Sequence, residues 1–178
     1  MVIGVFDALL LFLAGDGAKS GYDMRRLFQA TPLGIFSDSP GAVYPALARL
    51  EHRGLLRSSV EKQGRRRRTY GRTAAGEKAL RAWIAEPIDR ELLARRPQEF
   101  DLRFVITGEF VSWAEAQRFA ARCEKLYAAD LQRIKEYRDG PGRTMGRTSL
   151  AAIELGMRSI RTRLAWCRDV MSNRVVVK

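Results

Sequence analysis

Two segments at the start of the chain have the apolar spacing of helices. Residues 3–14 form an almost continuous apolar run, which predicts a buried first helix. Residues 20–29 are predicted to form a second helix, because Ser20 is a suitable N-terminal cap. The first run is too short to span a bilayer, carries Asp7 within it, and lacks the basic start of a signal peptide. We therefore expect both segments to belong to a globular domain and no membrane insertion.

The third predicted helix covers residues 39–52 and has one apolar face. Ser39 can cap it by accepting a backbone hydrogen bond, and Pro40 suits the first turn, where its missing N–H costs little. An apolar stripe at i, i+4 and i+7 is formed by Val43, Leu47 and Leu50. This stripe must face a core, which leaves the side that carries Tyr44 open. Glu51 lies near the C-terminal end, where the helix dipole disfavours a carboxylate, so we expect it to pair with a nearby arginine.

A basic hairpin is predicted directly after this helix. Residues 55–60 and 68–72 have the composition of strands, and Gly64 lies in the tip between them. Four consecutive arginines follow at the end of this tip: Arg65, Arg66, Arg67 and Arg68. The order helix, strand, basic tip and strand is that of a winged helix, and the second and third helices form a helix-turn-helix. A merely solvated tip is the alternative, but four like charges repel one another unless an anion offsets them.

The rest of the chain is predicted to be helical, and the fold class is mainly α. A fourth helix over residues 73–86 ends before a proline. We therefore place a winged helix-turn-helix domain at residues 1–86 and a helical domain at residues 87–178. Within the second domain, helices are predicted over residues 97–109 and 112–138.

The last segment of the chain carries an unbroken heptad pattern of apolar residues. Its members are Leu150, Ile153, Met157, Ile160, Leu164, Cys167 and Met171. Such a seam buries one side of a helix against another helix. The pattern fits equally an antiparallel hairpin within the chain and a contact between two chains. A symmetric dimer would bury the apolar surface that remains, so we expect the C-terminal domain to dimerise.

The composition and charge limit the classes of function. The 178 residues carry a formal net charge of +12, which suits a polyanionic partner such as double-stranded DNA and would also suit a membrane surface. The single histidine, His52, and two cysteines within helical patterns leave no metal site, disulfide framework or general base. There is also no Gly-rich phosphate loop. We therefore expect no enzyme, catalytic residue, cofactor or metal, and a cytoplasmic location.

We expect the third helix to enter the major groove of DNA while the arginine-rich tip contacts phosphates. The predicted DNA-binding residues are Ser39, Gly41, Tyr44, Pro45, Arg65, Arg66, Arg67, Arg68 and Arg72. Because few long polar side chains lie on the reading face, DNA shape should carry part of the specificity. Two alternatives stay open: a protein-interaction or nonspecific nucleic-acid-binding module, and a basic protein at a membrane surface.

Aromatic residues gather in the sequence around the domain boundary. Trp83, Phe100, Phe104 and Trp113 could line an apolar pocket there for a small aromatic or hydrophobic effector. The alternative is that these side chains only pack the two domains together.

The helix and hairpin segments resemble those of a known family. Residues 39–55, SPGAVYPALARLEHRGL, are similar to the recognition-helix signature of PadR-like transcriptional regulators. Residues 20–23 and 73–76 resemble the same family, so the similarity covers residues 5–85. It implies a cytoplasmic, dimeric repressor with a C-terminal helical dimerisation domain, which binds an inverted-repeat operator and leaves it when a small-molecule effector binds. Arg72 stands where the family usually has a leucine, which leaves the packing of the second wing strand open.

Overall fold

The computed structural model describes residues 3–15, 17, 19–60 and 67–175. The chain divides into two compact units, Met1–Glu86 and Pro87–Lys178. Both are mainly helical, and the N-terminal unit adds a small antiparallel sheet. No helix among the described residues is long and apolar enough to cross a lipid bilayer.

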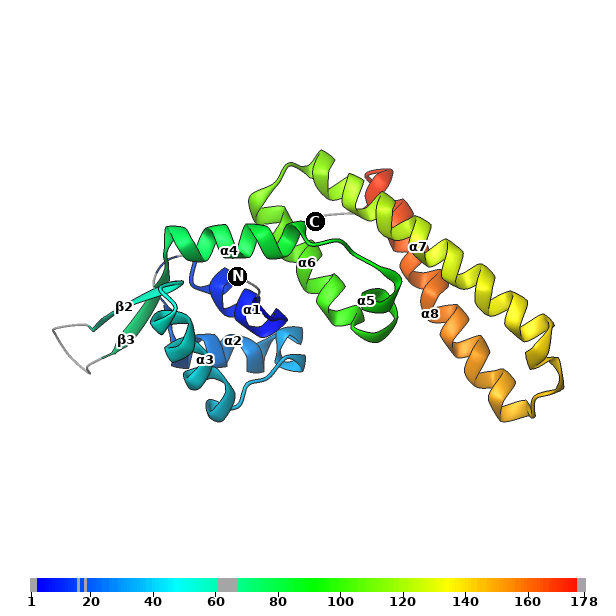
Figure 1. Ribbon diagram of the computed structural model, residues 1–178, viewed down its shortest axis with the longest axis horizontal. Helices are drawn as coiled ribbons and strands as arrows, with labels where there is room; N and C mark the ends of the chain where they lie inside the picture. The colour runs from blue at the N-terminus through cyan, green and yellow to red at the C-terminus, as the bar shows by residue number, and fades with distance from the viewer. Residues whose placement is uncertain (1–2, 16, 18, 61–66, 176–178) are drawn as a thin grey trace. The chain divides into compact units, whose positions relative to one another are not determined.

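The N-terminal unit is a winged helix-turn-helix domain, as predicted. Its elements are α1 (Val5–Leu13), β1 (Lys19–Ser20), α2 (Gly21–Ala30), the 3-10 helix η1 (Pro32–Ile35), α3 (Pro40–His52), β2 (Leu56–Val60), β3 (Arg68–Arg72) and α4 (Ala74–Ala85). The strand order is β1-β3-β2. In Figure 1, α3 lies beside the hairpin of β2 and β3, which we call the wing. The two-residue strand β1 is too short to show an alternating pattern, so the sequence does not reveal it.

Side-chain caps start three helices of this unit at the predicted positions. The capping residues are Ser20 for α2, Ser39 for α3 and Thr73 for α4, and each side-chain oxygen accepts a backbone N–H bond of 3.0 to 3.2 Å. Each bond satisfies a donor that has no partner in the first helical turn. The starts of these helices are therefore encoded locally.

The apolar stripe of α3 packs into the core of the N-terminal unit. Val43, Leu47 and Leu50 are each 0 % exposed. Helix α3 contacts both α1 and α2, whose fully buried side chains include Leu10 and Met24. With this stripe buried, the opposite face of α3 is the one that remains available for contact.

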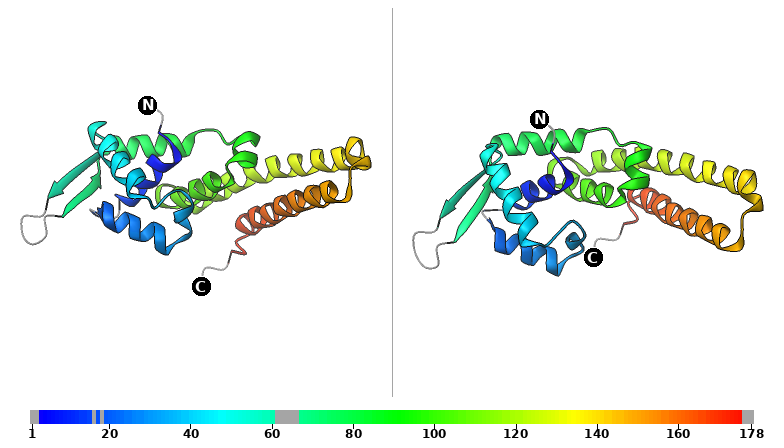
Figure 2. Two further views of the ribbon diagram at one scale, coloured as in Figure 1. Left: turned by 90° about the horizontal axis from the view of Figure 1, so that it is seen from below. Right: turned by 60° about the horizontal axis from the view of Figure 1, so that its bottom comes forward.

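The C-terminal unit consists of helices alone among the described residues. They are α5 (Arg90–Arg95), α6 (Pro97–Phe110), α7 (Trp113–Asp139), the 3-10 helix η2 (Pro141–Thr144) and α8 (Arg147–Met171). Both views of Figure 2 show α7 and α8 side by side as an antiparallel hairpin. The long helices are those predicted, whereas α5 has six residues and is too short to show a helical period.

Much of the heptad seam on α8 packs within this unit. Its buried members are Met157, Leu164 and Cys167. Leu164 and Cys167 belong to a core that also contains Phe119 of α7, and the sulfur of Met157 accepts a hydrogen bond of 3.8 Å from Arg138 of α7. The members that stay half-buried are Leu150, Ile153, Ile160 and Met171. The intrachain hairpin thus accounts for the buried part of the seam.

Candidate nucleic-acid interface

The N-terminal half of α3 presents an exposed edge. Ser39, Gly41, Tyr44 and Pro45 are all exposed, and Tyr44 retains 44 % of its accessible surface. The helix continues without interruption through Pro45. Because the first turn of a helix carries free N–H groups and the positive end of the dipole, this edge suits an approach to phosphates and base edges.

Tyr44 is positioned by the close approach of α2 and α3. A Cβ atom at Gly21 would lie 2.6 Å from the Cε1 atom of Tyr44 and 3.1 Å from the Cδ1 atom of Leu47. Glycine at the start of α2 therefore leaves the space in which the tyrosine ring lies. This packing orients Tyr44 while nearly half of its surface stays exposed.

Arg68 of β3 connects the wing to α3. Its Nη2 donates to Oε2 of Glu51 at 2.5 Å, and its Nε donates to the Ser58 hydroxyl at 3.0 Å. Hydrogen bonds from Ser58 and Arg68 hold the pKa of Glu51 below its usual value. The expected arginine partner of Glu51 is therefore Arg68. These contacts connect the wing to the C-terminal end of α3.

Arg67 also lies beside an acidic residue. Its guanidinium forms an ion pair with Asp23 of α2. Burial alone would raise the pKa of Asp23, but hydrogen bonds from Ser20 and the charge of Arg67 lower it overall. Arg65 and Arg66, the other members of the predicted run, lie outside the described residues. The two described members of the arginine run thus each pair with a carboxylate of the same unit.

Arg72 of β3 has a hydrogen-bond partner within the N-terminal unit. Its Nη1 donates to the backbone carbonyl of Leu11 in α1 at 3.2 Å, and the side chain is half-buried. A Cβ atom at Gly15 would lie 2.5 Å from the same nitrogen. The guanidinium therefore lies against the end of α1, where it satisfies a carbonyl group. This bond gives Arg72 a structural role within the domain, and its predicted contact with DNA stays a prediction.

The turn that precedes α3 is held by two side chains of α2 that sequence reasoning missed. Arg25 donates from Nε to the backbone carbonyl of Asp38 at 2.8 Å, and Gln29 donates to the Asp38 carboxylate at 3.3 Å. Asp38 directly precedes the Ser39 cap. A signal was available, because two polar residues one turn apart on α2 face the same way. These bonds help to place the start of α3.

The sequence of the winged-helix domain matches a family model. Residues 9–82 match the model described as the transcriptional regulator PadR-like family. These residues belong to the PadR-like family. The matched range includes α2, α3 and the wing, and thus every described residue predicted to contact DNA.

Solved structures similar to the chain include PadR-like proteins from bacilli. One is Bacillus subtilis PadR in complex with operator DNA, at 20% identity and a TM-score of 0.44 over 95% of this chain and 98% of that chain. Another is a PadR-like transcriptional regulator from Bacillus cereus, at 18% identity and a TM-score of 0.42 over 94% of each chain. Bacillus subtilis PadR in complex with p-coumaric acid is similar at 20% identity, with a TM-score of 0.42 over 95% of this chain and 98% of that chain. No curated protein matches the sequence.

The four predicted effector residues are distributed over α4, α6 and α7. Trp83 is buried on α4. Phe100 stacks on Phe119 with a centroid distance of 5.7 Å, and Phe104 meets Trp166 edge-on at 4.6 Å. The indole N–H of Trp113, a side chain 47 % exposed, donates to Asn173 at 2.6 Å. Phe100 is thus buried in the C-terminal core and Phe104 packs against it. The roles of these residues, in an effector pocket or between the domains, stay predictions.

Proposed function

We propose that this chain is a DNA-binding transcriptional repressor that acts in the cytoplasm as a homodimer on an inverted-repeat operator. The family match over the winged helix carries the proposal, because that match covers an α3 edge whose side chains are exposed. The edge formed by Ser39, Gly41, Tyr44 and Pro45 would enter the major groove. No catalytic role is part of the proposal.

The wing arginines would supply much of the affinity. In the free protein Arg67 and Arg68 pair with Asp23 and Glu51, both on helices of the same unit. A DNA phosphate offers each guanidinium another anion, and its neutralisation releases counterions condensed on the DNA. We infer that Arg67 exchanges its carboxylate for a phosphate. Arg68, which also donates a hydrogen bond to Ser58, would keep the wing aligned while Arg67 makes this exchange.

A second copy of the chain would provide the symmetry of the operator. The half-buried members of the heptad seam, together with Leu155, which is 68 % exposed, leave apolar surface along α8. Covering this surface with a symmetric partner would bring two copies of α3 to half-sites about one helical turn apart, or a multiple of it. We further propose that a small-molecule effector releases the repressor by binding more tightly to an arrangement that cannot hold DNA.

Competition between DNA fragments tests the proposal. A fragment with an inverted repeat from the DNA flanking the coding region should bind far more tightly than random DNA of equal length. Arg66→Ala and Arg67→Ala should weaken binding to both DNAs and lower the salt slope by about 1 per lost phosphate contact. Arg95→Ala, which removes an exposed cation of α5, is the control and should leave the slope unchanged. An unchanged slope in the wing variants would remove the wing from the interface.

The same competition decides the alternative function. A winged-helix module for protein interaction or nonspecific nucleic-acid binding would show a specificity ratio near one. The strong positive charge of the chain is consistent with this alternative, because charge alone supports binding to DNA of any sequence.

A further inference from the structure

The outward face of α3 has an apolar centre. Its four positions follow one another at i, i+4, i+7 and i+11, and we call them the outer stripe: Gly41, Pro45, Ala48 and His52. All four are exposed. With about 3.6 residues per turn, the outer stripe lies on the side of α3 opposite the buried stripe. Between its two ends, the outer stripe therefore presents only a pyrrolidine ring and a methyl group.

The charged side chains of α3 are held by partners within the N-terminal unit. Arg49 donates to the carboxylate of Asp7 on α1 at 2.5 Å. Glu51 accepts a hydrogen bond from Arg68 of the wing at 2.5 Å, and another of the same length from Ser58. These contacts direct the two charged groups toward α1 and the wing. They therefore hold the charges at the flanks of the outer stripe.

Two further polar side chains of α3 lie outside the centre of the outer stripe. Tyr44 is at its flank, where the ring packs in the space left by Gly21, and His52 is the last residue of the helix. Pro45 and Ala48 offer no hydrogen-bonding side chain. Direct contact between the centre of the outer stripe and a base edge must therefore be apolar.

Gly41 indicates that another surface approaches the outer stripe closely. Among the described residues, a Cβ atom at this position would meet only the Ser39 hydroxyl, at an ordinary contact distance of 3.6 Å. The backbone does not require glycine either, because the φ angle of Gly41 is not positive. Glycine nevertheless makes a helix less stable than alanine does. The packing of the domain thus does not explain this glycine, whereas the close approach of a ligand would.

The major groove of DNA offers one apolar group for such a contact. The base edges there carry hydrogen-bond donors and acceptors, except for the 5-methyl group of thymine. Apolar protein atoms that cover a donor or acceptor remove water from it without replacing the hydrogen bond, which weakens binding. The same atoms strengthen binding when they cover a methyl group. The centre of the outer stripe therefore matches thymine.

We propose that this chain reads its operator through the 5-methyl groups of thymine, which pack against Pro45 and Ala48. The lack of a side chain at Gly41 lets the start of α3 come close to the bases. Cytosine has a hydrogen atom in place of the methyl group and an amino group beside it, so it is disfavoured at these positions. The inference rests on the proposed function, because it assigns a base feature to the α3 edge that would enter the major groove.

Deoxyuridine tests the inference, because it differs from thymidine only by the missing methyl group. The probe is the inverted-repeat fragment from the flanking DNA, with deoxyuridine in place of every thymidine, titrated with the full chain. Each methyl group removed from a buried contact should weaken binding about fourfold. The two half-sites together should therefore lose about tenfold or more, and random DNA should lose nothing. Undiminished binding to the substituted fragment overturns the proposal.

Two alanine variants separate a direct contact from an effect on DNA shape. Ala48→Gly removes the proposed methyl contact, so it should weaken binding to the thymine fragment and reduce the further loss caused by deoxyuridine. Ala82→Gly is the matched control, because it makes the same change at an exposed position of α4. This control should show the full loss of the parent chain. If deoxyuridine weakens Ala48→Gly as much as the parent, the methyl groups act through DNA shape and the proposal is wrong.

Gly41→Ala tests the close approach in a folded protein. Alanine should leave the Tm of the free protein unchanged or raise it, because its Cβ atom meets no neighbour closer than an ordinary contact. The added methyl group should weaken operator binding about tenfold or more, because it crowds the contact with the bases. Undiminished binding, or a lower Tm, contradicts the role given to Gly41.

The outcomes distinguish this inference from the proposed function. Specific binding that persists undiminished in the deoxyuridine fragment removes the thymine contact and leaves the repressor. A specificity ratio near one removes both, because a protein that does not distinguish DNA sequences does not read base edges.

Discussion

The guanidinium of Arg49 on α3 donates a hydrogen bond of 2.5 Å to the carboxylate of Asp7 on α1. Arg53 adds a second contact to the same carboxylate at 3.5 Å. Asp7 is 7 % exposed and lies within a helix whose other buried residues are apolar. Because a buried carboxylate needs its partners, this ion pair helps to hold α1 against the recognition helix.

Replacing this carboxylate should loosen the recognition helix. We expect Asp7→Asn to lower the free energy of unfolding by about 1 to 3 kcal/mol, because hydrogen bonds to a charged, buried group are lost. Urea unfolding measures the change. Glu77→Gln is the matched control, since it removes an exposed pair with Arg81 on α4 and should have little effect. Equal losses in the two variants would show that the Asp7 contact does not stabilise the domain.

The pairing of Glu51 with the wing predicts a pH dependence. Hydrogen bonds from Ser58 and Arg68 hold the pKa of Glu51 below its usual value. The stabilisation is therefore complete above the unfolded pKa of about 4.3 and is lost as the pH falls through the lower folded value. We expect Glu51→Gln to lower the urea midpoint slightly at pH 7 and to match the parent chain at low pH. Glu109→Gln, at an exposed position of α6, is the control variant. Equal changes of the urea midpoint in the two variants at both pH values would contradict the pairing.

Gly76 on α4 should not tolerate a side chain. A Cβ atom there would lie 2.1 Å from the backbone carbonyl oxygen of Leu55, which cannot move without disturbing β2. We expect Gly76→Ala to destabilise the domain by about 1 to 3 kcal/mol, despite the better helix propensity of alanine. Gly108→Ala is the control, because nothing lies within 4 Å of its Cβ position on α6. That change should stabilise the protein by up to about 1 kcal/mol. Thermal unfolding of both variants is the measurement, and a stable Gly76→Ala would contradict the contact.

The two cysteines should resist modification in the native protein. Burial raises the pKa of Cys123 to about 12 and that of Cys167 to about 11. Since the thiolate is the reactive form, a disulfide reagent at pH 8 should label both thiols promptly in guanidinium chloride and neither promptly in native buffer. Spectrophotometry of the released thiolate follows the reaction. Rapid labelling of the native chain would show that the α7–α8 core opens readily.

Local features of the sequence were sufficient for much of the fold. The caps Ser20, Ser39 and Thr73 start helices where their side chains can reach a backbone N–H two or three residues ahead, which depends on adjacent residues alone. Helical periodicity likewise identified the buried stripe of α3. The partner of Glu51 also followed, because an acidic residue at the end of a helix needs a cation and the wing that follows is rich in arginine.

Contacts between distant segments could not be read from the same patterns. Arginine is a residue type that commonly contacts phosphate. The guanidinium of Arg72 nevertheless lies against the carbonyl of Leu11, sixty-one positions away in the chain. The sequence alone does not distinguish whether Phe100 and Phe104 line a pocket or pack in a core. Only the packing of α6 against α7 and α8 showed that their rings contact Phe119 and Trp166.

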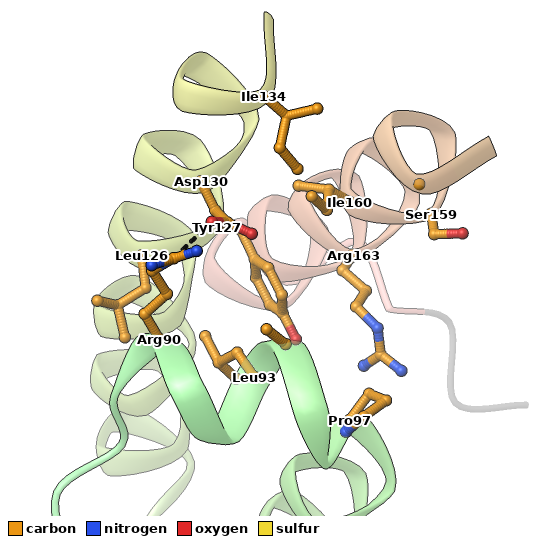
Figure 3. A pocket seen from close by; sticks show the side chains of 12 residues that line it. Arg90, Leu93, Pro97, Leu126, Tyr127, Asp130, Ile134, Ser159, Ile160 and Arg163 are labelled. Atoms are coloured by element: carbon orange, nitrogen blue, oxygen red, sulfur yellow. Dashed lines mark hydrogen bonds and ion pairs between the residues drawn. The ribbon is translucent and has the colours of Figure 1, made fainter. Parts of the chain in front are cut away.

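The sequence by itself determined the order of the helices and strands, the capped starts and the exposed edge of α3, because each depends on neighbouring residues or on one helical period. The tertiary structure alone decided that Asp7 binds Arg49, that Arg72 faces α1, and that the buried Tyr127 lies beside Arg163 (Figure 3). These relationships join positions far apart in the chain. They follow from which surfaces the folded chain brings together, and no local pattern encodes that choice.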